Sequence, residues 1–118
     1  MKSKITSLSK NIEFKSLLNG KKISNKYSTI FFKRLNNKNF KKLNVSFVAK
    51  KKLGNAVVRN RIKRRLQSVI RKNLQNKKNI NTDYSYLVFG KSKAYNEKYS
   101  IIEEEFDKTF YKINTSKN

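Results

Sequence analysis

The sequence contains no cysteine and no histidine. Without cysteine, the chain can form neither disulfides nor thiolate metal sites. Histidine is the side chain that most often serves in general acid–base catalysis at neutral pH, so its absence disfavours a protein-built active site. Carboxylates, the other common metal ligands, are missing from residues 14–82. We therefore predict that the protein alone binds no metal, no cofactor and no small-molecule ligand.

Long hydrophobic runs are also absent. No run approaches the roughly 20 apolar residues that a membrane-spanning helix needs, and residues 1–14 lack the apolar core of a signal peptide. We expect a cytoplasmic protein without a membrane partner.

Acidic residues are scarce, and their placement is uneven. The chain has 30 Lys and Arg against 7 Asp and Glu, which gives a formal net charge of +23. Residues 14–82 hold 21 of the basic residues, whereas four of the seven acidic residues fall in 103–107. Because self-repulsion at this charge weakens a compact state, the composition indicates a polyanionic partner. Nucleic acid is the first candidate, and an anionic membrane surface is the second.

The length of 118 residues suits one domain with one modest core. Hydrophobic spacing and turn residues predict helices over 11–19 and 57–77 and from Ser100 onward, and strands over 27–35, 43–50 and 84–89. The resulting order, α–β–β–α–β–α, is typical of an α+β domain. The short link at 36–39 predicts that the first two strands form an antiparallel pair. We expect residues 1–9 and 115–118 to be flexible.

The stretch 51–67, KKLGNAVVRNRIKRRLQ, carries the clearest functional signal. Val58, Ile62 and Leu66 form an apolar stripe on the predicted helix, and the remaining positions are largely basic. The usual interpretation of such a face is a solvated helix surface, but no carboxylate is nearby to pair with these cations. Gly54 permits a sharp turn before the helix. A helix N-terminus and arginine forks both suit phosphate, so this stretch predicts contact with a phosphate backbone.

These residues resemble a known family. Lys51, Gly54-Asn55-Ala56-Val57 and Arg59-Asn60-Arg61-Ile62-Lys63-Arg64 are similar to the signature of the protein subunit of bacterial ribonuclease P. The pattern Phe14-x-x-x-Leu18-x-Gly20, the SFVAKK strand before the motif and the YLVFG strand after it follow the family's order. The resemblance therefore covers nearly the whole chain.

The resemblance implies a single small α+β domain with a mixed sheet. In this fold a left-handed β–α–β crossover runs through the Arg-Asn-Arg helix, although crossovers of the opposite hand are the rule in proteins. It also implies a subunit of an endoribonuclease that removes the 5′ leader of precursor tRNA. A catalytic RNA subunit would hold the catalytic groups and the Mg²⁺ ions, while the protein would bind that RNA and the leader.

The resemblance assigns roles to particular residues. RNA contact is expected from the turn and the helix, at Lys51, Lys52, Gly54, Asn55, Arg59, Asn60, Arg61, Lys63, Arg64 and Arg65. A leader cleft is expected at Phe14 and Leu18, with an aromatic ring from Tyr27, Phe31 or Phe32 beneath them. The sequence departs from the family at two positions: Leu18 stands where the family often has Phe, and Gln67 stands where it often has Arg.

Two other functions are compatible with parts of the sequence. A ribosomal or other structural RNA-binding protein would explain the charge and the missing active site, but not the extended motif around Arg59. A membrane-surface polypeptide usually has one amphipathic segment, whereas the residue pattern of this sequence predicts three strands.

Overall fold

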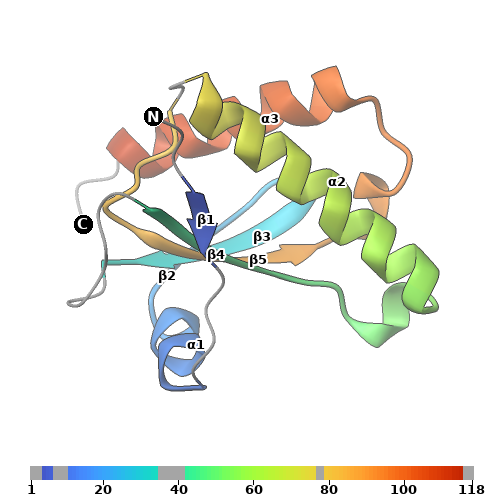
Figure 1. The fold of residues 1–118 in the computed structure, drawn as a ribbon, viewed down its shortest axis with the longest axis horizontal. Coiled ribbons are helices and arrows are strands. Elements are labelled where there is room, and N and C mark those ends of the chain that lie inside the picture. Colours follow the sequence, from blue (N-terminus) through green and yellow to red (C-terminus); the bar gives the residue numbers. More distant parts are fainter. Residues whose placement is uncertain (1–3, 7–10, 35–41, 77–78, 116–118) are drawn as a thin grey trace.

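A mixed five-stranded sheet lies in the middle of the structure, with helices on both of its faces (Figure 1). The computed structural model describes residues 4–6, 11–34, 42–76 and 79–115. The strands are β1 (Lys4–Thr6), β2 (Lys21–Ser24), β3 (Ser28–Lys33), β4 (Lys42–Val48) and β5 (Ser85–Gly90). The helices are α1 (Asn11–Leu18), α2 (Ala56–Gln75) and α3 (Tyr99–Thr115), with short 3-10 turns η1 (Lys51–Leu53) and η2 (Ser92–Ala94).

The strand order across the sheet is β1-β4-β5-β3-β2. β1 and β5 both run parallel to β4, whereas β3 is antiparallel to its neighbours β5 and β2. The predicted antiparallel pairing of the strands at 27–35 and 43–50 is therefore wrong. β5 lies between them, with Tyr86 opposite Val45 and Leu87 opposite Phe31. β5 is buried or half-buried along its whole length, which suits the centre of a sheet covered on both faces.

Two of the five strands were not predicted from the sequence. β1, Lys4–Thr6, lies inside the segment 1–9, for which no strand was predicted. β2 is a short, lysine-bearing edge strand, and lysine is depleted in strands generally. At the other end of the chain, α3 continues to Thr115, and residues 116–118 lie outside the described residues.

The helix α2 joins the parallel neighbours β4 and β5, as the resemblance implied. The hand of this crossover stays a prediction. α2 lies close to β5 at Gly90, where a Cβ atom would stand 2.5 Å from Cγ2 of Ile62. Only glycine leaves room for this approach, so Gly90 sets how near the basic helix lies to the end of β5.

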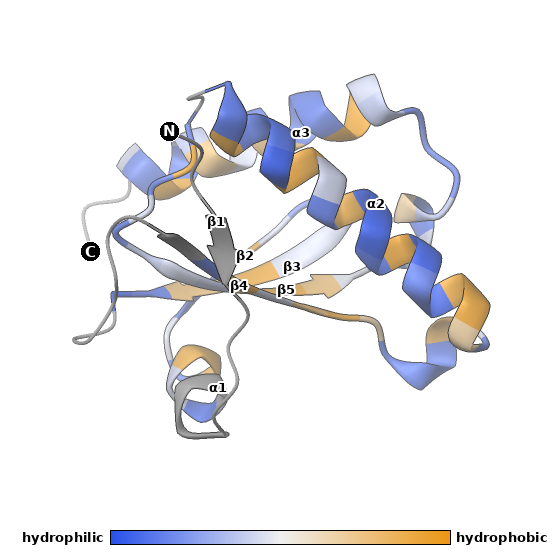
Figure 2. Cartoon of the chain, in the orientation of Figure 1, coloured by the Kyte–Doolittle hydropathy of each residue, from blue (hydrophilic) through white to orange (hydrophobic). Residues whose placement is uncertain are grey.

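The two faces of the sheet carry cores of different size. α2 and α3 cover one face, and their apolar side chains form the main core with Ile30, Val45 and Tyr86. α1 covers part of the other face, where Leu17 contacts Leu87 in a smaller cluster with Phe31 and Phe89 at its edge. In Figure 2, hydrophobic and hydrophilic residues take turns along α2 and α3, whereas the central strands are mostly hydrophobic. The partly covered face leaves room for a pocket.

Candidate nucleic-acid interface

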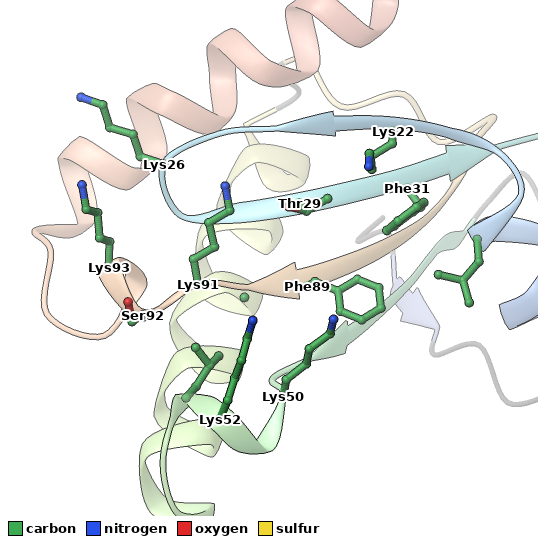
Figure 3. A pocket seen from close by; sticks show the side chains of 13 residues that line it. Lys22, Lys26, Thr29, Phe31, Lys50, Lys52, Phe89, Lys91, Ser92 and Lys93 are labelled. Atoms are coloured by element: carbon green, nitrogen blue, oxygen red, sulfur yellow. The ribbon is translucent and has the colours of Figure 1, made fainter.

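A pocket of about 750 Å³ opens beside α1 on the less covered face of the sheet. Its walls come from β2, β3, β5, the end of α1 and the segments around η1 and η2 (Figure 3). We call it the lysine pocket, since its lining includes Lys22, Lys26, Lys50, Lys52, Lys91 and Lys93. The other lining residues are Leu18, Thr29, Phe31, Leu53, Phe89, Gly90 and Ser92, and none of the lining is acidic.

Two phenylalanine rings form the apolar part of the lysine pocket. Phe31 on β3 and Phe89 on β5 are half-buried, and their ring centroids lie 5.6 Å apart in an edge-to-face arrangement. The ammonium group of Lys50 lies 5.4 Å from the Phe89 ring centre, and that of Lys22 lies 6.0 Å from the Phe31 ring centre. Aromatic faces stack on bases, and the surrounding cations attract phosphates. This combination suits a single-stranded nucleic acid.

Residues at the η2 end of the pocket are held by backbone contacts. The Nζ of Lys91 donates a hydrogen bond to the carbonyl oxygen of Asn25 at 2.7 Å, and its backbone N–H donates to the Tyr27 carbonyl at 2.9 Å. The Asn25 side chain in turn accepts hydrogen bonds from the backbone N–H groups of Tyr27 and Ser28, both at 2.8 Å. The turn before β3 and the segment after β5 therefore form one unit.

The predicted leader-cleft residues do not all meet in this pocket. Phe31 and Leu18 line it, but Tyr27 and Phe32 are 3% and 4% exposed and belong to the main core beyond the sheet. The structure therefore does not place Tyr27 and Phe32 in the pocket. Phe32 points away from it because neighbouring strand residues point to opposite faces, and Tyr27, which precedes β3, packs in the main core. Phe14 lies in α1, and its side chain is outside the described residues.

Tyr27 has a structural role instead. Its hydroxyl donates to a carboxylate oxygen of Glu97 at 3.3 Å, which ties the start of β3 to the segment before α3. Burial, together with the charge of Glu97, raises the pKa of the Tyr27 phenol.

Sequence reasoning missed Phe89, although it predicted the strand that carries it. The usable signal was alternation: Tyr86 and Val88 pack in the main core, so Leu87 and Phe89 must face the other side. Choosing that face required the register of β5 against β3, which the structure supplies.

The second basic surface is the exposed face of α2, which begins directly after the lysine pocket. Asn55 caps the helix, since its side-chain oxygen accepts the backbone N–H of Val58 at 3.0 Å. Gly54 before it has φ +144°, in the region that favours glycine, and a Cβ there would lie 3.0 Å from Val58. Lys52 and Leu53 line the pocket, so the turn joins both surfaces.

The predicted RNA-facing residues differ in how exposed they are. Lys51, Lys52, Asn60, Arg61 and Arg64 are exposed, as are Gly54 and Asn55 in the turn. Arg59 and Lys63 are half-buried on the flank, and the Nε of Arg59 donates to the Gly54 carbonyl at 3.1 Å. Arg61 is exposed but also anchored, because its Nε donates to the Tyr95 carbonyl at 2.9 Å. Arg71, two turns beyond Arg64, extends the exposed basic face and was absent from the predicted set.

Arg65 does not share this exposed surface, which corrects its predicted role. Its side chain is buried, at 8% exposure, between α2 and the segment before α3. Nε donates to the Ala94 carbonyl at 2.8 Å, and Nη2 donates to the Glu97 carbonyl. The guanidinium carbon lies 4.4 Å from the centre of the Tyr99 ring. Arg65 therefore holds protein segments together.

Four of the seven acidic residues lie along α3, on the far side of the sheet from the pocket. Glu103 forms an ion pair with Lys72 at 3.3 Å, and Asp107 accepts a hydrogen bond from the Asn73 side chain. Within the described ranges, no group of three or more Asp, Glu, His or Cys side chains could hold a metal ion. In the same part of the chain, no helix is both long and apolar enough to cross a membrane.

Comparisons with known proteins agree on one family. The family model described as Ribonuclease P matches residues 2–114. The ribonuclease P protein component of Fusobacterium nucleatum is 39% identical over 114 residues, covering 90% of this chain and 95% of that protein. The same component of Mycoplasma mycoides is 35% identical over 81 residues, covering 69% of this chain and 72% of that protein.

Solved structures show the same fold. The ribonuclease P protein of Thermotoga maritima superposes with a TM-score of 0.73 at 20% identity, covering 91% of this chain and 96% of that one. The Staphylococcus aureus protein superposes with a TM-score of 0.60 at 24% identity, covering 95% and 97%.

Proposed function

The chain belongs to the ribonuclease P protein family, and on this premise we propose a division of work between its two basic surfaces. As a ribonuclease P protein component, it takes part in tRNA processing together with an RNA subunit. The lysine pocket binds the single-stranded 5′ leader of precursor tRNA. The exposed face of α2 contacts the catalytic RNA subunit.

The chemistry of the pocket carries the first half of this proposal. Two adjoining phenylalanine rings surrounded by six lysines and no carboxylate match a short stretch of unpaired nucleotides. The rings offer stacking faces to bases of any sequence, and the lysines neutralise the phosphates between them. A double helix could not present its bases to rings at the floor of such a pocket.

The second half follows from the surface of α2. Arg64 and Asn60 project from the exposed side of a rigid helix, and among the described residues no acidic side chain forms an ion pair with Arg64. Arginine forks bind phosphate oxygens through paired hydrogen bonds, and a preformed helix loses little entropy when it binds. Because Lys52 and Leu53 join the pocket to the helix, leader and catalytic RNA would meet along one continuous surface.

In this arrangement the RNA subunit carries the catalytic groups for phosphodiester hydrolysis. We also assign the Mg²⁺ ions of the reaction to the RNA, because both protein surfaces are lined by cations, which repel Mg²⁺. The protein supplies positioning and charge neutralisation. We place this work in the cytoplasm, with the precursor tRNAs.

The test measures the affinity of the assembled protein–RNA complex for one tRNA carrying leaders of increasing length. We expect the affinity to rise over the first few nucleotides and then to level off, because the pocket accepts a short stretch. Equal affinity for leaderless and leader-bearing tRNA would overturn the leader assignment.

A further inference from the structure

Two arginines of α2 hold the same segment of backbone, and we call this pair the arginine clamp. Arg61 donates through Nε to the Tyr95 carbonyl at 2.9 Å, and Arg65 donates through Nε to the Ala94 carbonyl at 2.8 Å. They lie four residues apart, so both project toward the same side of the helix. Each guanidinium also lies against a tyrosine ring, Tyr95 at 4.9 Å for Arg61 and Tyr99 at 4.4 Å for Arg65.

The clamped segment continues directly into the wall of the lysine pocket. Residues 91–93 precede Ala94 and place Lys91 and Lys93 at the η2 end of the pocket (Figure 3). On its other side the segment is tied to the turn before β3, through the hydrogen bonds of Lys91 to Asn25 and Tyr27. The two lysines are thus carried by backbone that is fixed both by β3 and by α2.

The members of the clamp are not equivalent. Arg61 is exposed, so part of its guanidinium stays accessible to RNA. Arg65 is buried, and its Nε and Nη2 donate to the carbonyls of Ala94 and Glu97. A buried arginine that bridges two carbonyls on one segment fixes that segment firmly, because releasing it would leave a buried charge unpaired.

We propose that Arg65 is a positioning residue for the leader: it fixes residues 94–97 against α2 and thereby holds Lys91 and Lys93 at the pocket. This inference rests on the proposed binding of the leader in the lysine pocket. Without the clamp, the two lysines would have to be ordered on binding, which lowers affinity for the leader without affecting the rest of the tRNA.

The experiment uses the assembled complex with Arg65→Met, which keeps an unbranched apolar stem but removes the guanidinium and its donors. The readout is the ratio of affinities for one tRNA with and without its leader. We expect the ratio to fall about fivefold, the scale of losing one exposed ionic contact. Arg64→Met is the matched control, since it removes the same charge from the exposed side of the helix. Because Arg64 is assigned to the RNA subunit, this change should weaken assembly of the complex but leave the ratio for the assembled complex unchanged.

A double-mutant cycle separates positioning from a loss of stability. Lys93→Met alone should lower the ratio, and adding Arg65→Met should then lower it by much less than it does in the wild type, because both changes act through one contact. Additive losses would contradict the proposal. A ratio of affinities in Arg65→Met equal to that of the wild type would also contradict it. If Arg65→Met does not fold, Arg65→Lys replaces it, since lysine keeps the charge but lacks the planar fork that reaches both carbonyls. An unchanged ratio in Arg65→Lys would equally overturn the proposal.

The same data separate the two proposals. A wild-type complex that does not distinguish leader-bearing from leaderless tRNA removes the leader assignment itself. If the wild-type complex does distinguish them and the Arg65→Met complex distinguishes them equally well, only the role of Arg65 is ruled out.

Discussion

Phe31 and Phe32 are consecutive in the chain, yet their rings lie on opposite faces of the sheet. Phe31 lines the lysine pocket beside Phe89, whereas Phe32 lies in the main core, where its ring contacts Tyr84 at a centroid distance of 5.5 Å. The chain therefore contains a matched pair of aromatic residues, one in the pocket and one in the core.

This pair provides the first test. Phe31→Leu removes a stacking surface from the pocket, so the affinity gained from the leader should fall by about 1–3 kcal/mol, the usual worth of one base–ring stack. Phe32→Leu should leave that gain intact and lower the free energy of unfolding, because it opens space in the core. The measurements are binding of the assembled complex to tRNA with and without a leader, and denaturant unfolding of the protein. If both variants bind the leader alike, the pocket does not hold it.

Arg64 provides a second test, through the salt dependence of RNA binding. Arg64→Ala should weaken binding to the RNA subunit and lower the slope of log affinity against log salt by roughly 0.7–0.9, the value for one phosphate contact. Its circular dichroism spectrum should match that of the wild type, since the side chain is exposed. Lys108→Ala on the exposed side of α3 removes the same charge and should leave the slope unchanged. Equal slopes for both variants would argue that only net charge matters.

The start of α2 should be sensitive to its cap. Asn55→Ala removes the oxygen that accepts the Val58 N–H, so the free energy of unfolding should fall by about 1 kcal/mol. Asn55→Ser restores a capping oxygen and should recover most of that loss. Denaturant unfolding of the three proteins checks this, and a serine variant as unstable as the alanine variant would show that the cap contributes little.

Gly90 tests how closely α2 approaches the sheet. Gly90→Ala places a methyl group 2.5 Å from Cγ2 of Ile62, so we expect a loss of about 1–3 kcal/mol of stability from overcrowding. In an Ile62→Ala background the clashing atom is gone, and the same change should cost much less. Unfolding free energies of the four proteins in this cycle measure the difference. Equal costs in both backgrounds would rule out the contact as the cause.

The sequence predicts helix α2 to within two residues at each end, because a long amphipathic pattern defines both the helix and the side that packs on the sheet. The strands are harder to pair. The link between β3 and β4 is short, which favours a hairpin, but β5 comes between them from more than 35 residues further along the chain. Local spacing holds no information about such a partner.

The candidate site was predictable only in part. In β3 and β5 apolar residues occupy consecutive positions, because one face packs in the main core and the other carries the smaller cluster and the rings of the pocket, so no polar face shows which way Phe31 or Phe32 points. Arg65 illustrates a second limit. Helical phase places it beside the apolar stripe, but its partners, Ala94, Glu97 and Tyr99, are distant in the chain and become neighbours only in the fold.

The acidic residues of α3 have a consequence for how the protein arrives at its partner. The acidic residues of α3 lie on one side of the sheet and the lysine pocket opens on the other, so the charge of the molecule is unevenly distributed, with the pocket far from these acids. In the field of an RNA such a molecule experiences a torque as well as a pull, and it turns its pocket toward the RNA before contact. A larger share of encounters then begins in a productive orientation, which speeds association rather than slowing dissociation.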